Sequence, residues 1–237
     1  MIVSVIPRQY KRGDSLESRE MPDYAAQRAN MVQAQLATNA VTDPRILAVM
    51  GEVPRERFVP AAQRVICYSD LPVEVSPGRY LLDPRSFAKL LMLAEMRESD
   101  HVLDVGCTSG YSSTVLGRLA KSVVALEQDG ELVRLASELL PAIGAGNVTV
   151  IQGALSEGAK DQAPFDVILI NGAIEDQPKT LFSQLGEGGR LVAVMQQSPL
   201  GRAALFVREK GQIGVRAGFD AAVPLLKGFR KTVGFVF

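Results

Sequence analysis

Residues 101–111 read His-Val-Leu-Asp-Val-Gly-Cys-Thr-Ser-Gly-Tyr, and this stretch decides the fold. Residues 102–105 predict a short buried strand, 106–110 a tight turn bounded by glycines, and 111–119 a helix. Glycine lets the backbone approach a ligand closely and adopt angles that a side chain resists. A strand that passes through such a turn into a helix is how a doubly wound sheet holds a nucleotide at the carboxyl ends of its strands.

A second apolar run ends at Glu127, roughly 20 positions after Asp104, which is the spacing of a ribose-binding acidic residue. A carboxylate at that place accepts hydrogen bonds from ribose hydroxyls. The turn and Glu127 together predict that an adenosine-containing ligand binds here. The alternative interpretation is a strand-turn-helix corner that holds no ligand.

The spacing of the turn bears on which ligand this is. A dinucleotide turn reads G-x-G-x-x-G, whereas this chain has Gly106-Cys107-Thr108-Ser109-Gly110. It is closer to the D/E-x-G-x-G-x-G turn of S-adenosylmethionine-dependent methyltransferases, with Thr108 at the middle glycine. S-adenosylmethionine has no pyrophosphate, so a close backbone approach matters less. A nicotinamide-dependent oxidoreductase fits the spacing poorly.

Composition excludes several classes of function. The 237 residues are 47% hydrophobic, enough for one sizeable core, and 26 basic residues balance 26 acidic ones. The sequence contains no stripe of basic residues that would indicate binding to nucleic acid. No apolar run approaches the ~20 residues of a membrane span. Two cysteines make no disulfide framework, and one histidine with two cysteines makes no metal-ligand cluster. The apolar start lacks the features of a secretory signal. We expect a cytoplasmic protein with reduced thiols.

The organisation along the chain predicts one domain with an appendage. Residues 1–23 are expected to form a loose arm, which a partner subunit of a homo-oligomer could order. A single methyltransferase-like domain is expected over 24–237, with 24–83 as a cap of helices and loops and 84–237 as the core. Within the cap and at its junction with the core, helices are predicted over 24–38, 45–52 and 84–96, and a long loop over 61–83. Loops of that length in compact domains are usually functional.

From residue 101 onward, strands and helices alternate. The predicted strands span 101–105, 122–127, 148–152, 165–170 and 190–195, and the later helices 130–143 and 178–185. This alternation predicts an α/β fold, a doubly wound and mostly parallel Rossmann-like sheet. After residue 195 the pattern changes to an antiparallel hairpin over 203–208 and 213–217, with further strand material at 221–226 and 232–237.

Four elements resemble protein-L-isoaspartate O-methyltransferases, over roughly residues 28–227. Val53–Pro60 is similar to the family's V-P-R-x-x-F-V-P element and Tyr68–Val73 to its Y-x-D-x-P-L/I segment. Asp104–Tyr111 resembles its cofactor turn, and Leu185–Val192 its L-x-x-G-G-R-L-V run. The first two are specific, whereas the last two occur across many methyltransferases. The resemblance implies the methyltransferase type of Rossmann-like fold, S-adenosylmethionine as the cofactor, and a carboxylate of a protein or peptide as the methyl acceptor.

The acceptor segment departs from the family pattern. The family has G-Q-T-I-S-Q-P, whose threonine and serine lie at the substrate carboxylate, and this chain has residues 78–84, Gly-Arg-Tyr-Leu-Leu-Asp-Pro. Tyr80 replaces the threonine and Leu82 the serine, so two small hydroxyls are lost. Losing a buried hydrogen bond typically costs about 1–3 kcal/mol. Arg79 can still pair with an acceptor carboxylate. We therefore expect the protein to methylate isoaspartyl peptides poorly.

The cofactor segment departs as well. Where the family has G-D-G, whose aspartate reaches the adenine amino group, this chain has Gly153-Ala154-Leu155. Adenine would then be held by apolar walls and backbone groups, and Thr108 narrows the turn. Both changes weaken cofactor binding without excluding it. Asp104 either orients the turn through backbone hydrogen bonds or touches the ligand. The resulting cofactor-binding set is Asp104, Gly106, Thr108, Gly110, Glu127, Ala154 and Asn171.

Three other residues invite a chemical role, and each has a plainer interpretation. Asp83 precedes Pro84 and is expected to cap a helix, with a general base as the alternative. Cys107 is expected to be a small turn residue and His101 a solvated strand end. Asp83 is therefore the one catalytic candidate that is named, and no metal site is expected.

Two functions fit these observations. The first is an S-adenosylmethionine-dependent methyltransferase of the isoaspartate type, because in-line methyl transfer depends on positioning the reactants and not on a strong base. The alternative is a non-catalytic relative that keeps the fold as an interaction or regulatory module, which the replacements at positions 80, 82 and 154 favour.

Overall fold

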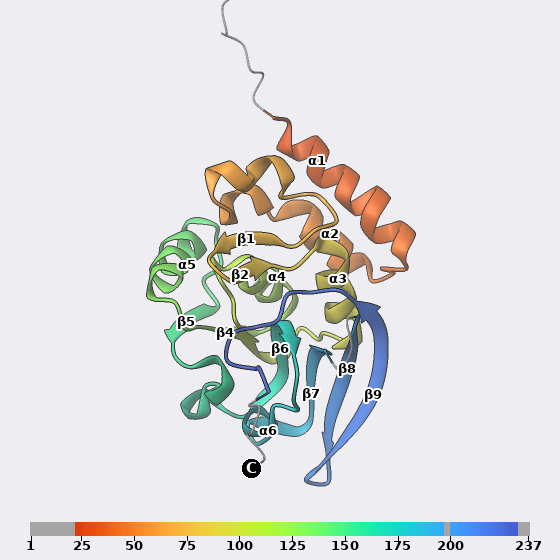
Figure 1. Ribbon diagram of the computed structural model, residues 1–237, viewed down its shortest axis with the longest axis vertical. Helices are drawn as coiled ribbons and strands as arrows, with labels where there is room; N and C mark the ends of the chain where they lie inside the picture. The colour runs from red at the N-terminus through yellow and green to blue at the C-terminus, as the bar shows by residue number, and fades with distance from the viewer. Residues whose placement is uncertain (1–21, 197–199, 232–237) are drawn as a thin grey trace, which may run out of the picture.

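One seven-stranded sheet organises the computed structural model, which describes residues 22–196 and 200–231 (Figure 1). Its order is β5-β4-β3-β6-β7-β8-β9. The strands are β3 His101–Val105, β4 Ser122–Glu127, β5 Val148–Gln152, β6 Phe165–Ile174, β7 Leu185–Met195, β8 Gly201–Glu209 and β9 Gln212–Ala221. β3 to β7 pair in parallel, and β8 and β9 add antiparallel. The predicted doubly wound α/β class with an antiparallel C-terminal part is confirmed.

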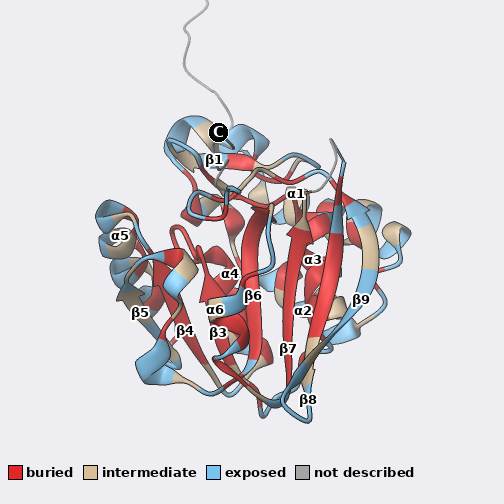
Figure 2. Ribbon diagram, turned by 60° about the horizontal axis from the view of Figure 1, so that its bottom comes forward, coloured by how far each residue is buried: buried red, intermediate tan, exposed pale blue. Residues whose placement is uncertain are grey.

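The sheet is buried on both faces at its centre. Along β6, Val167 and Leu169 pack into a cluster with the N-terminal helices, whereas Ile168 and Ile170 pack into a second cluster with α6 (Lys179–Phe182). Figure 2 shows the central strands buried, the edge strand β9 largely exposed and the other edge strand, β5, without a buried residue. Strands buried on both faces need continuous apolar runs, which is why the sequence identified them.

Helices cover the sheet and begin at recognisable caps. They are α1 Tyr24–Asn30, α2 Pro44–Glu52, α3 Pro84–Leu93, α4 Tyr111–Leu119, α5 Gly130–Ala142 and the short α6. The carboxylates of Asp43, Asp83 and Asp129 each accept a backbone N–H in the first turn of α2, α3 and α5. Such a cap satisfies a donor that has no partner within the helix. The expected capping role of Asp83 is confirmed.

For the cap, one prediction holds with a change in the type of helix, and one was wrong. The predicted helix over 24–38 is α-helical only to Asn30 and continues as a π-helix, Met31–Leu36, and a 3-10 turn, Ala37–Asn39. The predicted loop over 61–83 contains a 3-10 helix, Ala61–Ile66, and a hairpin of β1 (Val73–Ser76) and β2 (Arg79–Leu81). This hairpin lies at the carboxyl ends of the central strands (Figure 1).

Several predicted boundaries also shift. The helix from Pro84 ends at Leu93 instead of residue 96, and the helix over 178–185 shrinks to α6. β6 extends to Ile174, and β7 already begins at Leu185, through the glycine-rich residues 186–189. Of the strand material expected over 221–226, Ala221 ends β9 and Leu225 makes an isolated bridge with Ala173. Residues 232–237 lie outside the described part of the chain.

The remaining expectations meet the structure only in part. No helix within 22–196 and 200–231 is long and apolar enough to cross a membrane. Over the same ranges, no group of three or more His, Cys, Asp or Glu could hold a metal ion. Most of the predicted arm, residues 1–21, lies outside the described residues, so its role in a homo-oligomer stays a prediction.

Candidate active site

The turn after β3 has the backbone form that a ligand-binding glycine turn requires. Gly106, Thr108 and Gly110 all have positive φ, at 79°, 52° and 97°. Glycine adopts these angles freely, whereas a β-branched threonine is strained there. The Thr108 hydroxyl donates to the carbonyl of Cys107 at 2.7 Å, and its backbone N–H donates to Glu127 at 2.9 Å. These two bonds hold Thr108 where the family has a glycine.

Asp104 connects β3 to the start of α4 and to β6 through side-chain hydrogen bonds, and not through the backbone hydrogen bonds that were the first alternative. Its carboxylate accepts hydrogen bonds from Ser112 (2.7 Å), Ser113 (2.6 Å) and Asn171 (2.5 Å). Asn171 directly follows the strand predicted over 165–170, but it lies within β6, which continues to Ile174. Burial raises the pKa of Asp104 to about 6, although its three partners oppose the shift.

The raised pKa of Asp104 makes a testable contribution to stability. A carboxyl that binds its proton more tightly when folded stabilises the protein below the unfolded pKa of about 4 and loses that contribution as pH rises through 6. A rise in the pKa from about 4 to about 6 corresponds to about 3 kcal/mol. Between pH 4 and 7, the unfolding free energy of Asp104→Asn is therefore expected to rise by about this amount relative to the parent, measured by urea denaturation.

Asp161→Asn, which replaces an exposed carboxylate, is the matched control. Parallel curves for the parent and Asp104→Asn across this range would show that Asp104 titrates normally in the folded protein.

Glu127 lies at the end of β4 and faces the turn, as its spacing predicted. Its carboxylate is 0% exposed. One oxygen accepts the backbone N–H groups of Gln128 (2.8 Å) and Asp129 (3.1 Å). The other accepts Thr108 N–H at 2.9 Å and the Arg79 guanidinium at 2.6 Å. The carboxylate expected to hold a ribose is therefore already fully hydrogen-bonded by the protein.

Arg79 is the unexpected member of the site. It comes from β2, 48 residues before Glu127, and is 5% exposed. The sequence suggested an acceptor carboxylate as its partner, but the structure places it on Glu127. The local sequence pattern does not indicate that Arg79 and Glu127 pair. The one feature that drew attention to Arg79 was its position next to the two replaced hydroxyl positions, 80 and 82.

The acceptor side of the site is nearly filled. Tyr80 lies opposite Glu74 in the β1–β2 hairpin and is half-buried, whereas Leu82 is buried. The cavity that remains between this segment and the turn has a volume of only 10 Å³. It is lined by Arg55, Tyr80, Leu81, Leu82, Phe87, Thr108, Tyr111, Ser112 and Asn171. Tyr80 and Leu82 therefore lie next to the turn after β3, which carries part of the predicted cofactor-binding set.

Two of the family-like elements meet at Arg55, which is buried. Its guanidinium donates to the carbonyls of Cys67 and Leu82, each at 2.6 Å, and lies 4.7 Å from the centre of the Tyr111 ring. Its backbone N–H donates to the hydroxyl of Tyr68 at 3.2 Å. Arg55 thus fixes the acceptor segment and the start of α4 to the cap.

Three remaining side chains have structural places. The prediction that His101 is solvated was wrong, because its half-buried ring stacks on Phe165 at 4.9 Å and bonds Ser122. Cys107 is a buried turn residue, and burial raises the pKa of its thiol well above the usual value. Burial raises the pKa of Cys67 to about 11. Both cysteines are free thiols, and their raised pKa values disfavour reactivity.

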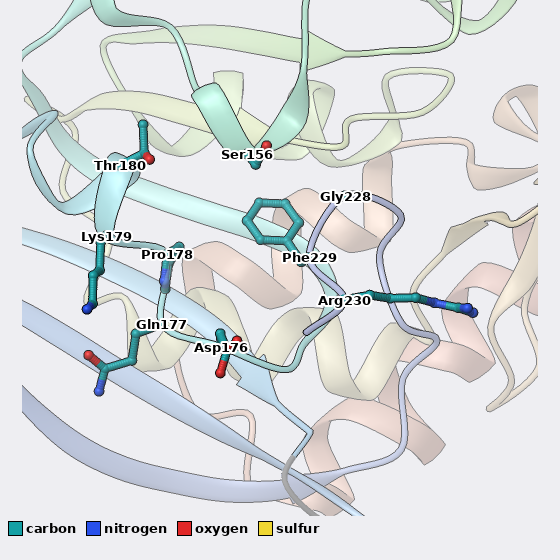
Figure 3. A pocket seen from close by; sticks show the side chains of 9 residues that line it. All are labelled: Ser156, Asp176, Gln177, Pro178, Lys179, Thr180, Gly228, Phe229 and Arg230. Atoms are coloured by element: carbon teal, nitrogen blue, oxygen red, sulfur yellow. The ribbon is translucent and has the colours of Figure 1, made fainter. Parts of the chain in front are cut away.

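A separate cavity of 580 Å³ opens beyond the carboxyl end of β6 (Figure 3). Phe229 lies in its middle, with Lys179 and Arg230 on opposite sides. None of the polar side chains that line it is fully buried. It contains none of the predicted site residues, so the candidate site remains the turn after β3.

The sheet, the turn after β3 and the carboxylate at the end of β4 form the arrangement expected of an S-adenosylmethionine-dependent methyltransferase. Solved structures share this fold. A protein-L-isoaspartate O-methyltransferase aligns over 86% of this chain and 67% of its own with a TM-score of 0.74 and 23% identity. A Plasmodium falciparum protein described as a putative member of that family, in complex with S-adenosyl-L-homocysteine, aligns over 88% of this chain and 100% of its own with a TM-score of 0.72 and 19% identity.

Sequence comparison identifies the family. Residues 26–224 match the family of protein-L-isoaspartate(D-aspartate) O-methyltransferases, and the chain belongs to it. A protein-L-isoaspartate O-methyltransferase of Koribacter versatilis is 40% identical over 211 residues, which are 88% of this chain and 95% of the relative. One from Rhodopseudomonas palustris is 37% identical over 175 residues, 74% of this chain and 71% of the relative. The resemblance first drawn from short motifs is confirmed.

Proposed function

We propose that this chain transfers a methyl group from S-adenosylmethionine to a carboxylate of a protein or peptide, as an isoaspartate-type methyltransferase. The observation that carries the proposal is the glycine turn after β3 with Glu127 at the end of the neighbouring strand β4. Membership of the family supports the same conclusion. The non-catalytic alternative has no support from the relatives.

The chemical types of the residues at the turn suit S-adenosylmethionine. We assign its binding to Asp104, Gly106, Thr108, Gly110, Glu127, Ala154 and Asn171. Glu127 is a hydrogen-bond acceptor suited to ribose hydroxyls, and Gly106 offers a backbone without a side chain. Because the three residues directly after β5, Gly153-Ala154-Leu155, include no acid, adenine would contact apolar and backbone groups there. When bound, the cofactor supplies a methyl group activated on a sulfonium.

The protein's own part in the reaction is to position the acceptor and exclude water. Methyl transfer to a carboxylate needs no strong base, so no general base has to be assigned. Asp83, the candidate general base, is buried, and its carboxylate accepts the backbone N–H of Ser86 at 2.8 Å. This bond supports its capping role.

The organisation of the protein is part of the proposal. Residues 24–237 would form one methyltransferase domain, with 24–83 as the cap that bears the acceptor segment and 84–237 as the core that holds the cofactor. The arm, residues 1–23, would be ordered by a second copy of the chain. The balanced charge and the protein acceptor suit a cytoplasmic enzyme with no nucleic-acid partner.

The activity is tested with isotopically labelled S-adenosylmethionine and a pair of peptides that differ only in one aspartyl or isoaspartyl residue. We expect a base-labile methyl ester on the isoaspartyl peptide alone, formed more slowly than the ordinary enzyme range of ~1 per second. No ester after prolonged incubation would contradict the proposed function. A rate of ~1 per second or faster would instead contradict the argument from Tyr80 and Leu82.

Glu127→Ala is expected to weaken the binding of S-adenosylhomocysteine by about 1–3 kcal/mol, the contribution of a charge-assisted hydrogen bond. The measurement is isothermal titration calorimetry. Glu131→Ala is the control, because Glu131 is an exposed acid on α5 that pairs with Arg134. Equal affinities for the parent and Glu127→Ala would remove Glu127 from the site.

A further inference from the structure

The ion pair of Arg79 and Glu127 occupies the Glu127 carboxylate, which the ribose of the cofactor needs as a hydrogen-bond acceptor. A carboxylate offers about four acceptor positions. In Glu127 three are used by backbone N–H groups of the turn and of the residues that follow β4, and the fourth by Arg79. The backbone donors belong to the frame of the site. Arg79 is the one side-chain donor on this carboxylate within the described chain, so a ribose hydroxyl has to replace it.

The open side of the glycine turn is covered by the same arginine. A methyl group built on Gly106 would lie 3.0 Å from Arg79 Nη2 and 3.3 Å from Leu226 Cδ1. A glycine at this position normally exposes backbone to the ligand. Here two side chains of the protein itself occupy that space.

Leu226 is held there by backbone pairing. Its N–H donates to the carbonyl of Ala173 at 2.8 Å, and the N–H of Ala173 donates to the carbonyl of Pro224 at 2.8 Å. Farther along, the N–H of Glu175 donates to the carbonyl of Phe229 at 3.1 Å. The segment 224–229 thus runs beside the end of β6, and Leu226 and Arg79 reach the turn from opposite parts of the chain.

Arg79 is held incompletely, which makes its displacement feasible. Its Nε and Nη1 atoms are buried and have no hydrogen-bond partner in the described structure. A buried guanidinium with unsatisfied donors loses much of the stabilisation that its ion pair provides. Beside it lies a cavity of 230 Å³, lined by Pro77, Arg79, Glu127, Gln128, Asp129, Leu155 and Lys227. The Arg79 side chain is therefore incompletely stabilised where it lies, and the adjacent cavity gives it space to move.

We propose that Arg79 and Leu226 form a clasp that closes the cofactor site, with Arg79 acting as an internal competitor of the cofactor for Glu127. The clasp sets the affinity for S-adenosylmethionine and S-adenosylhomocysteine, because either ligand binds only when the Arg79–Glu127 pair opens. The inference rests on the proposed function, since it concerns the same site. It makes Arg79 a determinant of cofactor affinity that the family pattern, with glutamine at this position, does not contain.

The test is calorimetric titration with S-adenosylhomocysteine of the parent, Arg79→Gln, Leu226→Ala and Arg85→Gln. Arg79→Gln is expected to bind at least tenfold more tightly than the parent. Leu226→Ala, which leaves the ion pair intact, should bind a few-fold more tightly. Arg85 is exposed, and Arg85→Gln should match the parent. Glu127→Ala removes the same ion pair but should weaken binding, so disruption of the pair alone cannot explain both signs.

Thermal unfolding gives a second readout. Arg79→Gln leaves Glu127 buried without its cation, so it should melt lower than the parent without ligand and gain more from saturating S-adenosylhomocysteine. If Arg79→Gln does not fold, Leu226→Ala decides. Equal or weaker binding by the variants than by a binding-competent parent would overturn the clasp and leave the proposed function standing. Failure of the parent and of every variant to bind would overturn both.

Discussion

Arg55→Met is expected to lower the free energy of unfolding by about 2–6 kcal/mol. The buried carbonyls of Cys67 and Leu82 would each lose a charged donor, and an unsatisfied buried group costs about 1–3 kcal/mol. The Tyr111 ring would also lose the guanidinium that lies on it. Methionine places an unbranched side chain in the space that Arg55 fills. The loss of unfolding free energy therefore reports the missing polar contacts more than a change in volume.

The control is Arg57→Met, two residues along the same short 3-10 helix, Arg55–Phe58, where the side chain is exposed. Its unfolding free energy should stay within about 0.5 kcal/mol of the parent, as is usual for surface changes. Chemical denaturation of the three proteins makes the comparison. Similar losses for both variants would mean that Arg55 does not hold the acceptor segment to the cap.

The double variant Tyr80→Thr/Leu82→Ser is expected to raise kcat/KM on an isoaspartyl peptide by about 10- to 100-fold. It restores two small hydroxyls where the cavity is now only 10 Å³. A net contribution of about 1 kcal/mol or more from each hydrogen bond gives a change of this size. The measurement is methyl transfer at saturating S-adenosylmethionine, so that an effect on cofactor affinity does not enter.

Tyr80→Val/Leu82→Ala separates volume from hydrogen bonding, because valine and alanine match threonine and serine in size but lack the hydroxyls. Only the hydroxyl-bearing pair should gain activity. Equal gains by both pairs would show that bulk alone limits the enzyme. No gain by either would place the acceptor away from these positions.

The core could be predicted from the sequence because its signals are local. Val167-Ile168-Leu169-Ile170 is a continuous apolar run, and burial on both faces of a parallel sheet requires one. The glycines at 106 and 110 marked a turn that needs positive φ, and both have it. Asp83 before Pro84 combined two local preferences for a helix start, and the structure shows the cap.

The parts that escaped prediction depend on contacts between distant residues. β1 and β2 are four and three residues long, too short for a period to register, and they are defined by pairing with each other. The place of Glu127 was predictable from spacing, but its partner was not. Arg79 could have faced solvent or an acceptor carboxylate, and only the position of the hairpin over the sheet brings it to Glu127.

The burial of the Arg79–Glu127 pair also determines how the protein responds to ionic strength. Mobile ions weaken charge pairs that water surrounds, over a distance of about 8 Å at physiological salt, but they act much less on pairs sealed from solvent. Arg134 and its partners Glu131 and Glu138 on α5 are largely exposed, so added salt reduces their attraction. The side chains of Arg79 and Glu127 are 6% and 0% exposed. Changes in the salt content of the cell should therefore leave this pair closed, and its opening requires a molecule that carries hydrogen-bond donors of its own into the site.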